Sequence, residues 1–223
     1  MAKLLITIDG PAGSGKSSAA KLLAAKLTAA FLDTGAMYRA AALAAMRTSC
    51  DLNDVTKLEE IIDKTDFKFE IEAGQMTVKI NGGDATEQIR DPQVTANVHF
   101  VASEPSLRQR IVRLQRAFAG RYEKIVAEGR DQGTVVFPDA DFKFFLTADA
   151  QERSKRRAKE LTEKGYKVDL DKLQQEIEKR DRQDSTRKIS PLIAAADAIT
   201  VNTTNLTLEQ VVEKIFGLIK NND

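Results

Sequence analysis

The feature that most constrains this sequence is Gly10–Ser17, which matches the phosphate-binding pattern G-x-x-x-x-G-K-[ST]. The apolar run Leu4–Ile8 before it predicts a buried strand, and the Ala- and Leu-rich stretch Ser18–Ala30 after it predicts a helix. In a loop between a strand and a helix, successive backbone N–H groups and the helix dipole can hold a polyphosphate. This order of elements therefore favours a nucleotide site over a chance glycine-rich turn.

Two side chains of this loop carry the expected chemistry. Lys16 is placed to reach the β- and γ-phosphates of ATP, and the hydroxyl of Ser17 is placed to hold Mg²⁺. The motif therefore predicts ATP and Mg²⁺ as cofactors, with Ser17 as the metal ligand.

Length and charge limit the remaining possibilities. The 223 residues suffice for one core with a small inserted domain. Lys and Arg total 34 against 33 Asp and Glu, so no long-range charge attracts the chain to nucleic acid or to an anionic membrane. No apolar run approaches the roughly 20 residues of a membrane span, and the lone Cys50 excludes an internal disulfide. We expect a cytoplasmic protein that binds neither nucleic acid nor a membrane.

The rest of the chain alternates short apolar runs with helical stretches. Further strands are predicted at Phe31–Asp33, Lys124–Glu128, Phe142–Leu146 and Ala198–Asn202. Further helices are predicted at 34–47, 53–64, 91–101, from 105 onward, and at 149–164, 169–186 and 207–219. Five strands separated mainly by helices predict an α/β fold, a five-stranded parallel sheet with helices on both faces.

One stretch departs from this alternation of strands and helices. Apolar and polar residues alternate in Phe67–Ile71 and again in Met76–Ile80, with the turn Ala73-Gly74 between them. This period of two predicts an antiparallel hairpin, with a further strand at about 85–87. We therefore expect a small antiparallel β insert at about 66–90.

Polar residues follow two of the predicted strands. Thr34 and Arg39 come after one strand, although Thr34 is also a plausible helix N-cap, and Arg130 and Asp131 come after another. Ligands of open α/β sheets bind at the carboxyl ends of the strands, so these residues are candidate ligand contacts. Arg153 and Arg157, four residues apart on one helix, repel one another unless an anion lies between them.

Several segments together resemble the bacterial cytidylate kinases, a family of P-loop nucleoside monophosphate kinases. The segments keep the order and spacing of that family across nearly the whole chain. They are Ile6–Ser18, Leu32–Arg39, Leu114–Phe118, Glu128–Pro138 and Arg180–Arg182, with Arg187 ahead of Pro191-Leu192. Many families share the phosphate loop, but Gly129-Arg130-Asp131 with its Thr-Val-Val-Phe-Pro tail is far more selective.

The resemblance implies one kinase unit over residues 1–223, with a monophosphate-binding region at 35–118 that includes the β insert, and a lid at about 150–165. It implies a monomer that transfers the γ-phosphate of ATP to CMP, and to dCMP likewise, in pyrimidine nucleotide metabolism. The products are ADP and CDP or dCDP.

The resemblance also assigns roles to individual residues. It places ATP on Gly10, Pro11, Ala12, Gly13, Ser14, Gly15, Lys16, Ser17 and Ser18. It places the CMP phosphate on Arg39, Arg130 and Arg187, the sugar near Arg180 and Asp184, and cytosine on Thr34, Arg108 and Asp131. The catalytic set is Lys16, Arg130, Arg153, Arg157 and Arg187. The chain departs from the family at His99, where a small hydroxyl residue is common.

The residues suit this reaction on their own chemistry. A monophosphate is already a nucleophile, so transfer needs alignment and charge neutralisation, which Lys16, Mg²⁺ and arginines supply. Asp131 can accept a hydrogen bond from the amino group of cytosine, whereas the carbonyl of uracil would repel it.

Two other functions stay open. One is a P-loop kinase of another acceptor, such as a different nucleotide or a small hydroxylated metabolite, and an alcohol acceptor could recruit Asp33 or Asp131 as a base. A nucleotide-driven switch or motor is disfavoured, because the sequence lacks an Asn-Lys-x-Asp guanine-reading segment and its net charge of +1 does not suit a nucleic-acid track.

Overall fold

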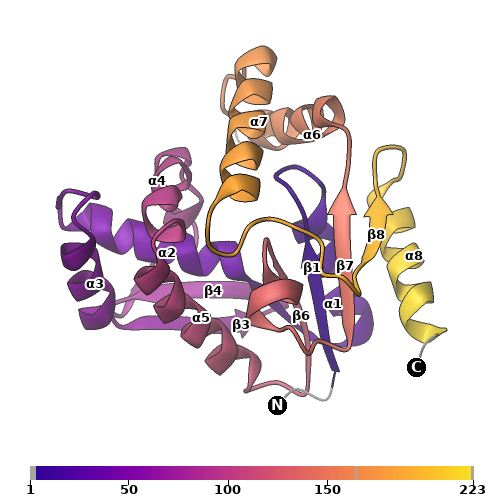
Figure 1. Cartoon of the computed structure of the whole chain (residues 1–223), viewed down its shortest axis with the longest axis horizontal. Helices are drawn as coiled ribbons and strands as arrows, with labels where there is room; N and C mark the ends of the chain where they lie inside the picture. The colour runs from indigo at the N-terminus through magenta and orange to yellow at the C-terminus, as the bar shows by residue number, and fades with distance from the viewer. Residues whose placement is uncertain (1–3, 164, 222–223) are drawn as a thin grey trace. The chain divides into compact units, whose positions relative to one another are not determined.

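The computed structural model describes residues 4–163 and 165–221 (Figure 1). Residues 29–125 form one compact unit, here called unit 1, and residues 4–28 and 126–221 form the other, unit 2. The main sheet has the strand order β2-β6-β1-β7-β8, and a separate sheet has the order β3-β4-β5. None of the helices in these described ranges is long and apolar enough to cross a membrane.

Unit 2 contains the phosphate loop and most strands of the main sheet. Its strands are β1 (Leu4–Asp9), β6 (Lys124–Gly129, whose first two residues fall in unit 1), β7 (Phe142–Thr147) and β8 (Ile199–Asn202). Its helices are α1 (Lys16–Leu27), α6 (Ala150–Glu163), α7 (Leu170–Thr186), α8 (Leu208–Lys220) and a single π-helical turn, η2 (Gln132–Val136). β1 pairs in parallel with β7, and β7 with β8, so these three strands run side by side in Figure 1.

The strands of unit 2 form because their apolar runs are removed from water. Ile6 and Ile8 of β1 and Phe144 and Leu146 of β7 are all buried. Continuous apolar runs are typical of parallel strands that are covered on both faces. The carboxyl ends of these strands therefore lie along one edge of a rigid sheet, where the phosphate loop begins.

Unit 1 is mainly helical and carries the β insert. Its main elements are β2 (Ala30–Asp33), α2 (Thr34–Arg47), α3 (Val55–Lys64), α4 (Pro92–Ala102) and α5 (Pro105–Ala119). The insert consists of β3 (Phe67–Glu72), β4 (Gln75–Ile80) and β5 (Gly83–Asp84), followed by the short 3-10 helix η1 (Gln88–Arg90). The Ala-rich helix α2 is buried over most of its length and packs against α3, α4, α5 and η1.

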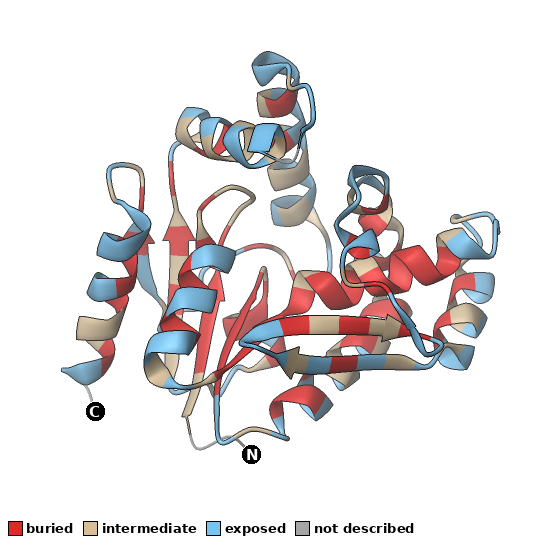
Figure 2. Cartoon of the chain, turned by 180° about the vertical axis from the view of Figure 1, so that it is seen from behind, coloured by how far each residue is buried: buried red, intermediate tan, exposed pale blue. Residues whose placement is uncertain are grey.

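The predicted antiparallel hairpin is confirmed. Phe69 lies opposite Val78 in the β3–β4 pair, and buried residues recur at every second position of β4 (Figure 2). Ala73 and Gly74, with φ of 49° and 73°, form a tight turn of the kind that matches strand twist. The third strand, however, lies at Gly83–Asp84 and not at 85–87, because a second left-handed turn immediately follows β4 and starts the pairing early.

The prediction of a five-stranded parallel sheet with a small antiparallel insert is thus confirmed. The predicted bounds of the first helix, Ser18–Ala30, are wrong at both ends. It begins at Lys16 and ends at Leu27, because Thr28 takes a left-handed conformation with φ of 52° and Ala30 already belongs to β2. The helix predicted at 149–164 is observed as Ala150–Glu163, and residue 164, which also falls in the predicted lid, lies outside the described residues.

Candidate functional site

The phosphate loop fits closely against its neighbours through its glycines. A Cβ atom on Gly10 would lie 2.1 Å from the carbonyl oxygen of Leu146, and one on Gly13 would lie 2.7 Å from that of Arg153. Both glycines also have positive φ, 153° and 73°, which side-chain-bearing residues rarely adopt. The bare backbone therefore packs against β7 and α6, and α1 presents its N-terminus directly after the loop.

Lys16 lies inside this loop. Its side chain is buried, and its ammonium donates to the carbonyl oxygen of Pro11 at 3.1 Å. Burial, together with the positive charges of Arg130 and Arg180, lowers the pKa of Lys16 to about 7, although Glu128 opposes this shift. A phosphate group would supply the negative charge that this buried ammonium needs.

The metal ligand expected at Ser17 has an acidic neighbour. The Ser17 hydroxyl donates to Oε1 of Glu128 at 2.9 Å, and Glu128 is a buried residue near the carboxyl end of β6. Hydroxyl and carboxylate oxygens suit Mg²⁺, which usually takes few protein ligands and completes its shell with water and phosphate. Sequence reasoning gave Glu128 no role, although an acidic residue at the end of a strand was an available signal.

Arg153 does not point away from the protein as an exposed lid arginine would. It is 7% exposed, its Nε donates to the carbonyl oxygen of Ala148 at 3.0 Å, and its Nη1 donates to that of Ala12 at 2.9 Å. The same guanidinium pairs with Asp181, which also accepts from the backbone N–H of Ala12 at 3.3 Å. In this structure Arg153 supports the phosphate loop, and its place in the catalytic set stays a prediction.

The other arginines of α6 differ from one another. Arg157 pairs with Glu160 at 2.9 Å on the surface, so its role at phosphate also stays a prediction. Arg156 pairs with Glu152 at 3.0 Å, and it also donates to Oγ1 of Thr203 at 3.0 Å. Because Thr203 in turn donates to the carbonyl oxygen of Ser14 at 3.1 Å, the segment after β8 braces the phosphate loop.

Three of the predicted acceptor residues come together in unit 2. Nε of Arg130 donates to Oδ2 of Asp184 at 3.0 Å, and Arg187 lies 3.7 Å from the other oxygen of that carboxylate. Burial would raise the pKa of Asp184, but Arg130, Arg180 and Arg187 hold it below its usual value. Asp184, predicted to lie near the sugar, therefore also orients two arginines that are predicted to bind phosphate.

Asp131 is buried at the start of η2, and a second carboxylate lies beneath it. Asp9, the last residue of β1, accepts hydrogen bonds from the backbone N–H groups of Gln132 and Gly133 at 2.9 and 2.8 Å. Burial, with a smaller contribution from the negative charge of Asp131, raises the pKa of Asp9 to about 6 against the effect of these two hydrogen bonds. Sequence reasoning assigned no role to Asp9.

Unit 1 holds three of the other predicted contacts, Thr34, Arg39 and Arg108. Arg39 pairs with Asp33 at 2.9 Å, and Asp33 also caps α2 by accepting from the N–H of Ala36 at 2.8 Å. The N-cap is therefore Asp33, whereas Thr34 is the first, buried residue of the helix. Asp33 was missed as a contact of Arg39 because the sequence does not show which side chains turn toward one another.

Arg108 and His99 lie on two successive helices of unit 1. Arg108 is buried, donates to the carbonyl oxygen of Ala102 at 2.9 Å, and has its guanidinium carbon 5.3 Å from the ring centre of Tyr38. His99 is exposed, with Nδ1 2.8 Å from the carbonyl oxygen of Ala96 and its ring against that of Phe100. These contacts fix both side chains locally.

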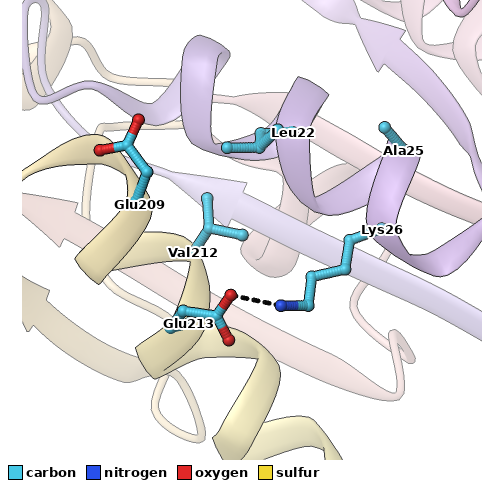
Figure 3. Close-up of a pocket in the computed structure, with 6 residues that line it drawn as sticks. All are labelled: Leu22, Ala25, Lys26, Glu209, Val212 and Glu213. Atoms are coloured by element: carbon cyan, nitrogen blue, oxygen red, sulfur yellow. Dashed lines mark hydrogen bonds and ion pairs between the residues drawn. The ribbon is translucent and has the colours of Figure 1, made fainter.

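A pocket of about 370 Å³ lies elsewhere in unit 2, between α1 and α8 (Figure 3). Its only cationic lining group, Lys26, already pairs with Glu213, and Glu209 adds a second carboxylate. This lining would repel a nucleotide phosphate, so the pocket is not the candidate site.

Comparison with known proteins agrees with this geometry. The profile of the cytidylate kinase family matches residues 6–221. A cytidylate kinase of Caldicellulosiruptor saccharolyticus is 46% identical over 98% of this chain and 96% of its own length. The cytidylate kinases of Leuconostoc mesenteroides subsp. mesenteroides (45% identical, 100% of this chain, 99% of the relative) and Pelotomaculum thermopropionicum (47%, 96%, 95%) are similarly close. A Thermus thermophilus protein of known crystal structure matches 99% of this chain and 98% of its own, with a TM-score of 0.51 at 17% identity, which concerns the fold alone.

Proposed function

The chain belongs to the cytidylate kinase family, and we propose that it transfers the γ-phosphate of ATP to CMP, giving ADP and CDP. The observation that carries this proposal is the proximity of two phosphate-binding groups within unit 2. Lys16 lies in the phosphate loop, close enough to Arg130 and Asp184 for their charges to affect its pKa. A donor phosphate on Lys16 and an acceptor phosphate on Arg130 would therefore be neighbours.

Catalysis by these residues consists of alignment and charge neutralisation. Lys16 binds the transferring phosphate, and Arg130 and Arg187, oriented by Asp184, grip the acceptor phosphate through their planar guanidinium groups. The acceptor phosphate oxygen attacks directly, so no side chain has to remove a proton. Mg²⁺ on Ser17 and Glu128 would neutralise charge on the phosphates of ATP when it is bound.

Cytosine is read by a buried carboxylate in this proposal. Asp131 accepts a hydrogen bond from the amino group of cytosine, and uracil would place a carbonyl against it. Thr34 and Arg108 of unit 1 complete the base contacts, and Arg39 adds a third arginine to the acceptor phosphate. A buried group left unpaired by the wrong base gives strong discrimination.

Other parts of the proposal concern the enzyme as a whole. Residues 35–118 form the monophosphate-binding region, and residues at about 150–165 form a lid whose closure excludes water, so that ATP is not hydrolysed. We extend the proposal to dCMP as a second acceptor, to a monomer and to the cytoplasm, for which the free thiol of Cys50 is suited.

The test is ADP release from ATP and Mg²⁺ with CMP, dCMP, UMP, AMP, GMP or no acceptor. Turnover with CMP and dCMP far above the others is the expected result. Turnover that is equal with and without acceptors would reject the proposal in favour of a nucleotide-driven switch. A kinase of another nucleotide would turn over UMP, AMP or GMP faster than CMP, and a kinase of a small hydroxylated metabolite would show no turnover with any of the five nucleotides. Asp33 is poorly suited to be the base of such an enzyme, because it caps α2 and pairs with Arg39.

A further inference from the structure

The helical turn η2 is capped by a residue far away in the sequence. Its first two backbone N–H groups, of Gln132 and Gly133, both donate to the carboxylate of Asp9, at 2.9 and 2.8 Å. Asp131 occupies the N-cap position of this turn, yet its side chain makes no capping hydrogen bond. The cap is thus supplied by the neighbouring strand β1.

This arrangement is unusual for an aspartate in the N-cap position. Asp is among the preferred N-cap residues because its side chain readily accepts the second or third N–H of the helix that follows. Asp131 would be expected to turn back onto its own helix if those N–H groups were available. The second of them, that of Gly133, is not available, because Asp9 is 4% exposed and its two oxygens are bonded to the N–H groups of Gln132 and Gly133.

We propose that Asp9 is a positioning residue for base recognition, which caps η2 in place of Asp131 and so keeps the Asp131 carboxylate directed at the amino group of cytosine. This inference rests on the proposed function, in which Asp131 reads the base. The two carboxylates repel one another, which further opposes a turn of Asp131 toward the N–H groups that Asp9 holds.

The position of Asp9 gives this contact a second consequence. Asp9 is followed immediately by Gly10, the first residue of the phosphate loop, whereas Gln132 follows immediately after Arg130 and Asp131. One carboxylate therefore ties the strand that leads into the ATP loop to the segment that binds the acceptor. These two hydrogen bonds help to fix the distance between the donor and acceptor sites within unit 2.

The test is a double-mutant cycle with Asp9→Asn and Asp131→Asn. Asparagine at position 9 keeps only one acceptor oxygen, so one N–H of η2 loses its partner and Asp131 turns to replace it. Asp9→Asn should raise the KM for CMP at least about tenfold, the effect of one lost hydrogen bond to a charged group, and leave the KM for ATP within about twofold. The preference for CMP over UMP should fall by a similar factor.

The double variant separates positioning from general damage. If Asp9 acts through Asp131, the double variant should be no worse toward CMP than the poorer single variant. Effects that multiply would overturn the inference, as would a KM for CMP that Asp9→Asn leaves unchanged. Asp141→Asn is the matched control, because exposed Asp141 accepts from the N–H of Leu5 at 2.7 Å, at the opposite end of β1. Its effect should multiply with that of Asp131→Asn.

A second measurement covers the case in which Asp9→Asn does not fold. In Asp131→Asn, hydrogen exchange at the Gln132 and Gly133 amides should match the wild type, because Asp9 alone caps them. Faster exchange would mean that Asp131 shares the cap and would overturn the inference. Turnover of the wild type with CMP is measured first, so failure of the proposed function is recognised separately.

Discussion

Arg153 and Asp181 hold the two backbone polar groups of the same phosphate-loop residue. Arg153 of α6 donates to the carbonyl oxygen of Ala12, and Asp181 of α7 accepts from its N–H, while the two side chains pair with each other. α6 and α7 pack together, as Figure 1 shows, and together they grip the loop that would bind ATP. A displacement of either helix would therefore also displace the phosphate loop.

Arg153→Met should destabilise the protein and weaken ATP binding. The change leaves the Asp181 carboxylate without its cation in a largely buried position, which costs about 3 kcal/mol of unfolding free energy. The KM for ATP should rise more than the KM for CMP, since Ala12 belongs to the ATP loop. Urea unfolding and steady-state kinetics measure both effects.

The control for Arg153→Met is Lys159→Met on the same helix. The Lys159 side chain is 81% exposed and lies 3.9 Å from Glu163, a surface pair worth less than about 1 kcal/mol. Equal unfolding free energies for the two variants would show that the contacts of Arg153 with Ala12 and Asp181 do not stabilise the protein.

Binding of ATP should be accompanied by proton uptake at Lys16. The pKa of this ammonium is lowered to about 7, and bound phosphates would raise it again. At pH 8 a group with that pKa is mostly neutral, so binding should take up somewhat less than about one proton per site. Calorimetry with a non-hydrolysable ATP analogue, in buffers of different ionisation enthalpy, measures this number. The same uptake in Lys16→Met would assign the proton to another group.

The sequence predicted those features that depend on local pattern. The strand–loop–helix order around Gly10–Ser17 and the period of two in the β insert both identify their elements correctly, because the pattern itself is set by burial. The end of α1 was missed because Thr28 adopts a left-handed conformation, which is a property of its surroundings and not of threonine.

The partners of the site residues could not be predicted in this way. Ser17 with Glu128, Ala12 with Asp181, and Asp9 with η2 each join residues more than a hundred positions apart. Such contacts follow from the order of strands in the sheet, which periodicity does not give. The resemblance named Arg39 and Ser17, but not the carboxylates that they contact, since Asp33 and Glu128 act through other side chains.

Glu128→Gln should weaken metal binding without unfolding the protein. The amide keeps the shape and can still accept from Ser17, but it removes the negative charge beside the hydroxyl. Loss of such a partner typically weakens metal affinity by about 10–100-fold. Binding of Mn²⁺ to the ADP complex, followed by electron paramagnetic resonance, measures the effect apart from turnover.

The control for this experiment is Glu163→Gln, which changes an exposed side chain of α6. Mn²⁺ affinity that is the same in both variants would exclude Glu128 from the metal site, and Ser17 would then remain as the proposed protein ligand.

Lys16→Met should abolish turnover and yet stabilise the fold at low pH. Turnover should fall at least about a hundredfold, because the charge on the transferring phosphate loses a preorganised partner. The pKa of Lys16 is lowered from 10.5 to about 7, so the folded state binds fewer protons than the unfolded state between these values. Keeping Lys16 charged therefore costs stability in full below pH 7, and this cost declines as the pH rises toward 10.5.

Thermal unfolding at pH 6 and at pH 9, without nucleotide, checks the sign of this effect. Lys16→Met should melt above the wild type at pH 6, by a margin that shrinks at pH 9, whereas Lys21→Met, on the exposed side of α1, should show no such pH-dependent margin. A variant that melts below the wild type at pH 6 would mean that the bond from Lys16 to the Pro11 carbonyl stabilises the loop by more than the burial of the charge costs.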